Sequence, residues 1–273
     1  ITRDLAIAEE LRRHIPGVEL SWLAAHPASL VLKEKGENLL PEAELYADDN
    51  KAAEDAAQEG FRLNLLKYLS NAMGQWKQNV EIFKQVITKE CFDVVVADEA
   101  YEIEIALGKG YVRTDRPFVM IFDFFGNVSM GWNPVGRLMT YMWNREWAKC
   151  RSFYSNENFT ALFAGELEDV PDRSLGFLLP NARNIAQEVC NFVGYVLPFK
   201  PAEYANKSAV RAELGYSERP LIICSIGGTS VGKDLLLLCG QAYPIIRDRI
   251  SNLQMVIVCG PRLAAKSLDF PAG

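Results

Sequence analysis

The chain has 273 residues, of which 49% are hydrophobic and 23% are charged, and its formal net charge is −6. These values are typical of a folded protein with room for two domains. The negative charge argues against a nucleic-acid-binding protein, because such a protein needs a basic face to neutralise phosphates. No apolar run approaches the roughly 20 residues of a membrane-spanning helix.

Alternating helices and strands are predicted for the first two thirds of the chain. Helices are expected at 2–15, 28–35, 61–89, 99–107 and 133–149, and strands at 18–24, 93–97, 117–122 and 151–155. Residues 37–49 are expected to hold a short strand within loops. The strands at 93–97 and 117–122 are unbroken apolar runs, which are typical of parallel strands buried on both faces. Residues 157–187 show no clear periodicity and are expected to be rich in loops.

A segment with two prolines at 194–201 is expected to link two domains. Beyond it we predict helices at 208–214 and 231–250 and strands at 221–225 and 254–259, with Pro244 breaking or kinking the second helix. The alternation predicts the α/β class with two Rossmann-like parallel-sheet domains. Their expected bounds are residues 1–197 and 198–273, with the second domain incomplete.

A glycine loop after the strand at 221–225 is the most informative feature of the chain. Between this strand and the leucine-rich helix, Ile226 is followed by two glycines and two hydroxyl-bearing residues: Gly227, Gly228, Thr229 and Ser230. Glycines let the backbone approach an anion, and the free N–H groups at a helix start attract negative charge. The loop therefore predicts phosphate binding.

Three interpretations of the glycine loop are open. The first is a tight turn without a ligand. The second is the P-loop of nucleoside triphosphatases, whose spacing Gly227 and Gly232-Lys233 match. However, Asp234 stands where that motif has the Ser or Thr that holds magnesium, and no later strand ends in the Asp that completes the metal site. The third is a diphosphate site without a metal, in which Lys233 is incidental.

Several segments in this order resemble the GT-B glycosyltransferases, in particular the branch with the bacterial murein N-acetylglucosaminyltransferase and the macrolide and glycopeptide enzymes. Residues 2–12 resemble the helix after the family's N-terminal glycine-histidine loop, and residues 194–196 resemble the approach to its interdomain linker. Residues 219–229 and 256–262 resemble the first two strands of its donor domain. The family's glycine-histidine loop would lie before Ile1, and its later glycine-rich segment after Gly273, so both ends are expected to be cut.

The resemblance implies an enzyme that moves a hexosyl or N-acetylhexosaminyl group from a nucleotide-diphosphate sugar, such as a UDP sugar, to an acceptor hydroxyl. It implies donor diphosphate binding by residues 227–230 and contacts on the nucleotide side from Gly260, Pro261 and Arg262. The alternative is a noncatalytic sugar-nucleotide-binding relic of the same fold. In the family the catalytic base often comes from the missing glycine-histidine loop.

Candidate acceptor residues follow the apolar strands of the N-terminal half. Asp98-Glu99 and Asp123 come directly after strands, and ligands of open α/β sheets bind at the carboxyl ends of strands. We therefore take Asp98 and Asp123 as candidate bases, with helix capping as the competing role. Further expected acceptor contacts are Thr2, Glu99, Phe124 and Phe125, the two aromatics forming an exposed apolar wall unless they pack in the core.

No cofactor or metal is expected beyond the co-substrate. The six cysteines and two histidines are scattered singly, and the Asp-x-Asp metal motif of other glycosyltransferases does not occur. Expected partners are the nucleotide-sugar donor and a small-molecule or lipid-linked acceptor, with no nucleic acid. The expected location is cytoplasmic, with peripheral membrane contact through the aromatic segment 132–149 as the alternative to core packing.

Overall fold

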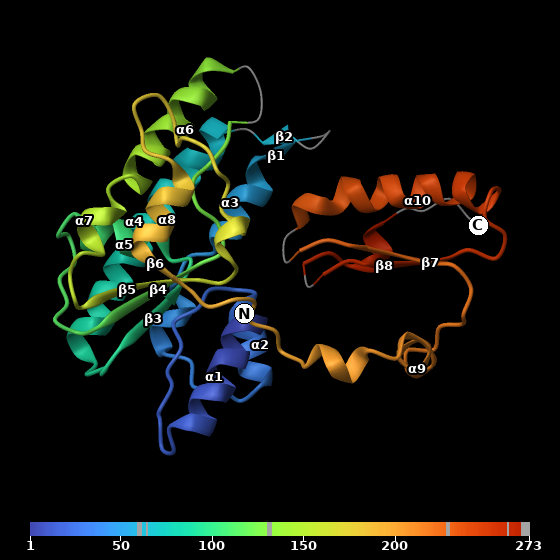
Figure 1. The fold of residues 1–273 in the computed structure, drawn as a ribbon, viewed down its shortest axis with the longest axis horizontal. Helices are drawn as coiled ribbons and strands as arrows, with labels where there is room; N and C mark the ends of the chain where they lie inside the picture. Colours follow the sequence, from blue (N-terminus) through green and yellow to red (C-terminus); the bar gives the residue numbers. More distant parts are fainter. Residues whose placement is uncertain (59–61, 64, 130–132, 228–229, 261, 269–273) are drawn as a thin grey trace. The chain divides into compact units, whose positions relative to one another are not determined.

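The computed structural model describes residues 1–58, 62–63, 65–129, 133–227, 230–260 and 262–268 (Figure 1). By their internal contacts the residues form two compact units. The first unit comprises Ile1–Leu20 and Trp76–Pro198, and the second comprises Ser21–Gln75 and Phe199–Gly273. The division after Pro198 falls within the expected linker, whereas residues 21–75 group with the C-terminal segment.

The first unit is built on a four-stranded parallel sheet. Its elements are α1 (Thr2–His14), α4 from Trp76 onward (Leu65–Lys89), β3 (Val95–Asp98), α5 (Tyr101–Gly108), β4 (Phe118–Phe122), α6 (Pro134–Trp147), α7 (Cys150–Phe153), β5 (Phe159–Phe163), η2 (Leu167–Asp169), α8 (Ala182–Val189) and β6 (Cys190–Phe192). The strand order is β3-β4-β5-β6, all neighbours being parallel. Figure 1 shows α4, α5, α7 and α8 grouped around these strands.

The two strands that the sequence marked as buried differ in the structure. In β4 four of the five side chains are buried, which confirms the prediction. In β3 none is fully buried, and Val96 is 49% exposed. Among the described residues β3 pairs only with β4, so it lies at a sheet edge, and the expectation of full burial was wrong for that reason.

Other predictions for the first two thirds of the chain also need correction. The predicted strand at 151–155 is helix α7, and the strand of that region is β5, within the segment expected to be loops. The predicted strand at 18–24 and the one within 37–49 reduce to a single bridge between Trp22 and Leu39. Short segments of this kind take their conformation from their neighbours in space, which periodicity does not reveal.

The second unit holds two small sheets and several helices. Its elements are α2 (Ala28–Glu34), η1 (Pro41–Glu44), α3 (Asp49–Ala56), β1 (Ala57–Gln58), β2 (Arg62–Leu63), η3 (Pro201–Tyr204), α9 (Lys207–Glu213), β7 (Leu221–Ser225), η4 (Ser230–Gly232), α10 (Lys233–Arg247), β8 (Gln254–Val258) and η5 (Ala265–Ser267). Strands β1 and β2 pair antiparallel, while β7 and β8 pair parallel with Leu221 opposite Gln254.

Helix α10 connects β7 to β8 and lies along them (Figure 1). Its Leu236 packs with Leu263 and Leu268 into a small core. The helix runs from Lys233 to Arg247 with Pro244 inside it, so of the expected break or kink at Pro244 the break was wrong. Because Pro244 has no N–H, the helix lacks the hydrogen bond from this position to the Gly240 carbonyl.

The fold class is α/β, as predicted, with a four-stranded and a two-stranded parallel sheet. In the part of the chain that the structure describes, no helix combines the length and apolarity needed to cross a bilayer.

Candidate functional site

Acidic side chains gather at the carboxyl ends of two neighbouring strands in the first unit. Asp98 is the last residue of β3, Glu99 follows it, and Asp123 directly follows β4. The parallel register sets Asp98 opposite Ile121, and the backbone N–H of Glu99 donates to the Ile121 carbonyl at 3.1 Å. The three candidate residues therefore lie at the carboxyl-terminal end of the sheet, where α/β proteins bind ligands.

Arg3 of helix α1 is the cation of this carboxylate cluster. Its Nη2 atom lies 2.5 Å from Oδ1 of Asp98, and its Nη1 atom lies 3.6 Å from Oδ2 of Asp123. The Arg3 side chain is only 20% exposed, and its Nε atom is buried without a hydrogen-bond partner. Sequence reasoning missed Arg3 because it is one of many basic residues on amphipathic helices, and only the fold brings it to the strand ends.

The carboxylates of the cluster hold their protons unusually tightly. Burial, followed by hydrogen bonding to and repulsion by Asp4, raises the pKa of Asp98 to about 7, although Arg3 opposes the shift. Burial, followed by the hydrogen bond and charge of Asp123, raises the pKa of Glu99 to about 8. Partly desolvated acids that compete for one guanidinium prefer to stay protonated. Such groups exchange protons near neutral pH.

Glu99 is held in an uncommon backbone conformation. Its φ angle is 56°, in the left-handed region that residues other than glycine rarely adopt. Its Oε1 atom accepts a hydrogen bond from the Tyr101 hydroxyl at 3.4 Å. Burial and the nearby charge of Glu99 raise the pKa of Tyr101, so this tyrosine remains a donor. Backbone strain of this kind is concentrated at functional sites.

An aromatic group borders the carboxylate cluster. The Tyr101 ring packs against Phe124 and Trp147, with ring centroids 5.4 and 5.3 Å apart. Phe124 is 41% exposed, whereas Phe125 is 1% exposed and packs on Trp147 at 4.5 Å. The expected wall of two exposed aromatics is therefore corrected to Phe124 alone. Thr2 is exposed beside Arg3 on α1.

The glycine loop of the second unit lies between β7 and η4. Of the residues expected to bind the donor, Gly228, Thr229 and Pro261 lie outside the described residues. Gly260 has φ +73°, and a Cβ atom there would lie 2.7 Å from the Gly227 carbonyl oxygen. Only glycine fits this close approach, which brings the ends of β7 and β8 together.

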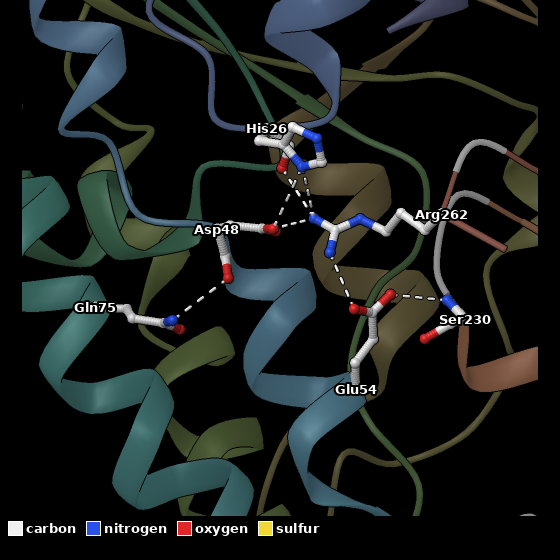
Figure 2. Close-up of polar contacts among 6 residues, drawn as sticks. All are labelled: His26, Asp48, Glu54, Gln75, Ser230 and Arg262. Carbon is white, nitrogen blue, oxygen red and sulfur yellow. Dashed lines mark hydrogen bonds and ion pairs between the residues drawn. The ribbon is translucent and has the colours of Figure 1, made fainter. Parts of the chain in front are cut away.

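A charged cluster holds the other two expected donor residues, Ser230 and Arg262. The Ser230 backbone N–H donates to Oε1 of Glu54 at 2.7 Å, and Nη1 of Arg262 lies 3.0 Å from Oε2 of the same carboxylate (Figure 2). The Nη2 atom of Arg262 bonds the Asp48 carboxylate and the His26 carbonyl, the latter at 3.1 Å. Figure 2 also shows Gln75 donating to the Asp48 backbone carbonyl, at 3.4 Å.

Sequence reasoning found Ser230 and Arg262 but missed the residues that join them. Glu54 and Asp48 belong to or adjoin α3, a short helix in a charged stretch that no apolar periodicity marks. His26 was set aside as an isolated histidine. Lys233, which the P-loop interpretation requires, is the first residue of α10.

The described residues contain no group of three or more His, Cys, Asp or Glu side chains arranged to hold a metal ion. The known protein families and the curated proteins with which the chain was compared include no match to it.

Proposed function

We propose that this chain is a GT-B glycosyltransferase with two Rossmann-like domains, which moves a sugar from a nucleotide-diphosphate sugar to an acceptor hydroxyl. The observation that carries the proposal is the carboxylate cluster at the strand ends of the first unit. A general base works best when its pKa is close to the working pH. Glu99 and Asp98, with pKa values of about 8 and 7, meet that requirement.

In the proposed reaction Glu99 is the base and Asp123 and Arg3 position it. The carboxylate of Glu99 takes the proton of the acceptor hydroxyl, and the acceptor oxygen forms a bond to the anomeric carbon. The bond between that carbon and the diphosphate oxygen breaks, and its electron pair leaves with the nucleoside diphosphate. Phe124 offers the acceptor an apolar contact beside the cluster.

The donor role falls to the second unit in this proposal. Its support is the strand–glycine loop–helix arrangement from β7 to α10, with Ser230 and Arg262 as hydrogen-bond donors. Backbone N–H groups and a guanidinium stabilise the negative charge that develops on a leaving diphosphate.

A second candidate function is a noncatalytic sugar-nucleotide-binding protein of the same fold. One observation favours it: the Ser230 N–H, a donor that the transfer reaction needs for its leaving group, is already bonded to Glu54. A protein of this kind binds the nucleotide without transferring the sugar.

Two measurements test the proposed function. First, UDP and thymidine diphosphate are titrated by calorimetry into the wild-type protein and the Gly228→Asp variant; we expect wild-type binding that the variant loses. Second, release of nucleoside diphosphate from UDP and thymidine-diphosphate sugars is followed with acceptor mixtures. Glu99→Gln should leave nucleotide binding intact and slow release by about 10²- to 10⁴-fold.

Glu157→Gln, at an exposed position of the same unit, is the matched control and should behave as wild type. If neither nucleotide binds the wild-type protein, the donor assignment is wrong. If nucleotides bind but no sugar donor turns over, the noncatalytic candidate replaces the enzyme.

A further inference from the structure

The carboxylate of Glu54 accepts a hydrogen bond from the Ser230 backbone N–H, a group of the glycine loop that is expected to bind an anion. One of its oxygens accepts the Ser230 backbone N–H at 2.7 Å, and the other faces Nη1 of Arg262 at 3.0 Å (Figure 2). A carboxylate and a phosphoryl group present similar oxygens to the same kinds of donor. Glu54 thus occupies the position of an anionic ligand with a side chain of the protein itself.

The ionised state of Glu54 matches that of a bound anion. Burial by itself would raise the pKa of Glu54, but the Ser230 N–H and the charge of Arg262 outweigh burial and lower it. The side chain is 17% exposed, so the carboxylate is largely removed from water and bonded at both oxygens. It is therefore charged at neutral pH, as a diphosphate is.

The cluster around Glu54 leaves polar groups unsatisfied. The Arg262 side chain is 10% exposed, yet its Nε atom is buried without a hydrogen-bond partner. The Oδ1 atom of Asp48 is buried without a partner as well. Buried polar atoms are nearly always paired in folded proteins. The cluster therefore leaves one guanidinium N–H and one carboxylate oxygen without a partner.

We propose that Glu54 is an internal competitor for a phosphate site formed by the Ser230 backbone N–H and the Arg262 guanidinium, and that a diphosphate binds there only when the carboxylate has left. The proposal rests on the donor role assigned to the second unit above. Ser230 has a single backbone N–H, so a phosphoryl oxygen and the Glu54 carboxylate cannot both accept it. The Glu54 carboxylate and a phosphoryl group within hydrogen-bonding distance of the same donor would also repel each other, because both are negatively charged.

Glu54 belongs to the short helix α3, which contacts η4. Arg262 bonds both Glu54 and the Asp48 carboxylate just before this helix, so it keeps one carboxylate partner when Glu54 leaves. The released Nη1 atom of Arg262 and the Ser230 N–H are then free for the diphosphate. The exchange replaces the single charge of the carboxylate by the larger negative charge of a diphosphate at the same donors.

Binding of inorganic pyrophosphate tests the proposal without any nucleotide or sugar. Calorimetry compares wild type, Glu54→Gln and the control Asp55→Asn, which changes an exposed acid next in sequence. We expect Glu54→Gln to bind pyrophosphate at least about tenfold more tightly than wild type, equivalent to about 1.4 kcal/mol. The control should stay within about twofold of wild type. Thermal unfolding verifies that each variant is folded.

The Ser230 amide proton in the wild-type protein gives a second readout that needs no variant. Its NMR resonance should move when pyrophosphate replaces the carboxylate as acceptor. Equal pyrophosphate affinities of wild type and Glu54→Gln would overturn the competitor role of Glu54 while leaving the donor role of the second unit intact. Tighter pyrophosphate binding by Glu54→Gln without any nucleotide binding would support the competitor and contradict the donor role. An absence of pyrophosphate binding in every variant, with an unmoved Ser230 resonance, would overturn both.

Discussion

The two units each place an arginine among carboxylates, with opposite results. In the first unit Arg3 pairs with Asp98 and Asp123, and the pKa values of Asp98 and Glu99 are raised to about 7 and 8. In the second unit Arg262 pairs with Asp48 and Glu54, and the pKa of Glu54 is lowered.

The difference lies in how many donors each carboxylate finds. Glu99 faces Asp123 and Asp98 as well as Arg3, so burial and repulsion outweigh attraction. Glu54 accepts from a backbone N–H and a guanidinium, one at each oxygen. An arginine and its carboxylates thus form a cluster that holds protons in the first unit and a cluster that stays ionised in the second unit.

Removal of the arginine should distinguish the two units most strongly. Arg262→Met leaves Asp48 and Glu54 as buried charges without their main partner, and we expect the second unit to lose about 3 to 5 kcal/mol of unfolding free energy. Hydrogen exchange of the β7 and β8 amides measures this loss. Arg249→Met, at an exposed position of the same unit, should change little.

Arg3→Met provides the comparison in the first unit. Because Asp98 and Glu99 are already largely protonated at pH 6, loss of their cation leaves little unpaired charge, and we expect a loss of only about 1 kcal/mol. Equal losses of unfolding free energy for Arg262→Met and Arg3→Met would contradict the proposed difference between the ionised cluster of the second unit and the protonated carboxylates of the first.

Gly260, which lies close to the Gly227 carbonyl, offers the next largest effect. Gly260→Ala should cost about 2 kcal/mol or more, because its φ is positive and the new Cβ atom would approach the Gly227 carbonyl. Gly215 also has a positive φ but has no atom within 4 Å of such a Cβ. Gly215→Ala should therefore show only the backbone strain, about 1 kcal/mol. A smaller loss at Gly260 than at Gly215 would contradict the close approach.

The two units should respond to pH in opposite directions. Asp98 and Glu99 have folded pKa values above their ordinary values of 3.8 and 4.5, so the folded first unit binds extra protons. Its stabilisation by these groups is complete below about pH 4 and is lost as the pH rises through about 7 to 8. Glu54 has a lowered pKa, so its contribution is present above its ordinary value of 4.5 and lost as the pH falls.

Hydrogen exchange, corrected for its intrinsic pH dependence, measures both units in one sample. From pH 5 to pH 8 we expect β4 and β5 to lose at least about 1.4 kcal/mol, the equivalent of one pKa unit. Strands β7 and β8 should keep their protection in this range. Unchanged protection of β4 and β5 would show that the carboxylates of the first unit are not shifted, and a parallel decline in both units would show that the loss does not arise from these carboxylates.

The smallest expected effect is a change in a single pKa. Arg3 opposes the raised pKa of Glu99, so Arg3→Met should raise that pKa by a further unit or less, about the size of one ion pair. Carboxyl NMR measures the shift, and the acid limb of any transfer activity, which reports deprotonation of the base, should follow it. Arg13→Met, whose side chain lies exposed on the same helix, is the control.

The sequence predicted the long or strongly patterned elements well. Helix α1, helix α4 and strand β7 appear where hydrophobic spacing places them. It failed at β5 and α7, which are short and whose conformation depends on pairing with β4 or on packing rather than on their own pattern.

The candidate sites were predicted in part. The carboxylates at 98, 99 and 123 were expected from the rule that ligands bind at strand ends, and the structure brings them together. Arg3 and Glu54 were not foreseen, because their roles depend on contacts across 95 and 176 residues of sequence. No local pattern encodes which charged side chain of a surface helix meets a distant loop.

A carboxyl-detected NMR titration of the wild-type protein tests the central contrast most directly. We predict that Asp98 and Glu99 titrate near pH 7 and 8 and that Glu54 titrates below its ordinary 4.5. Titration of all three groups near pH 4, or of Glu54 above 4.5, would contradict the account.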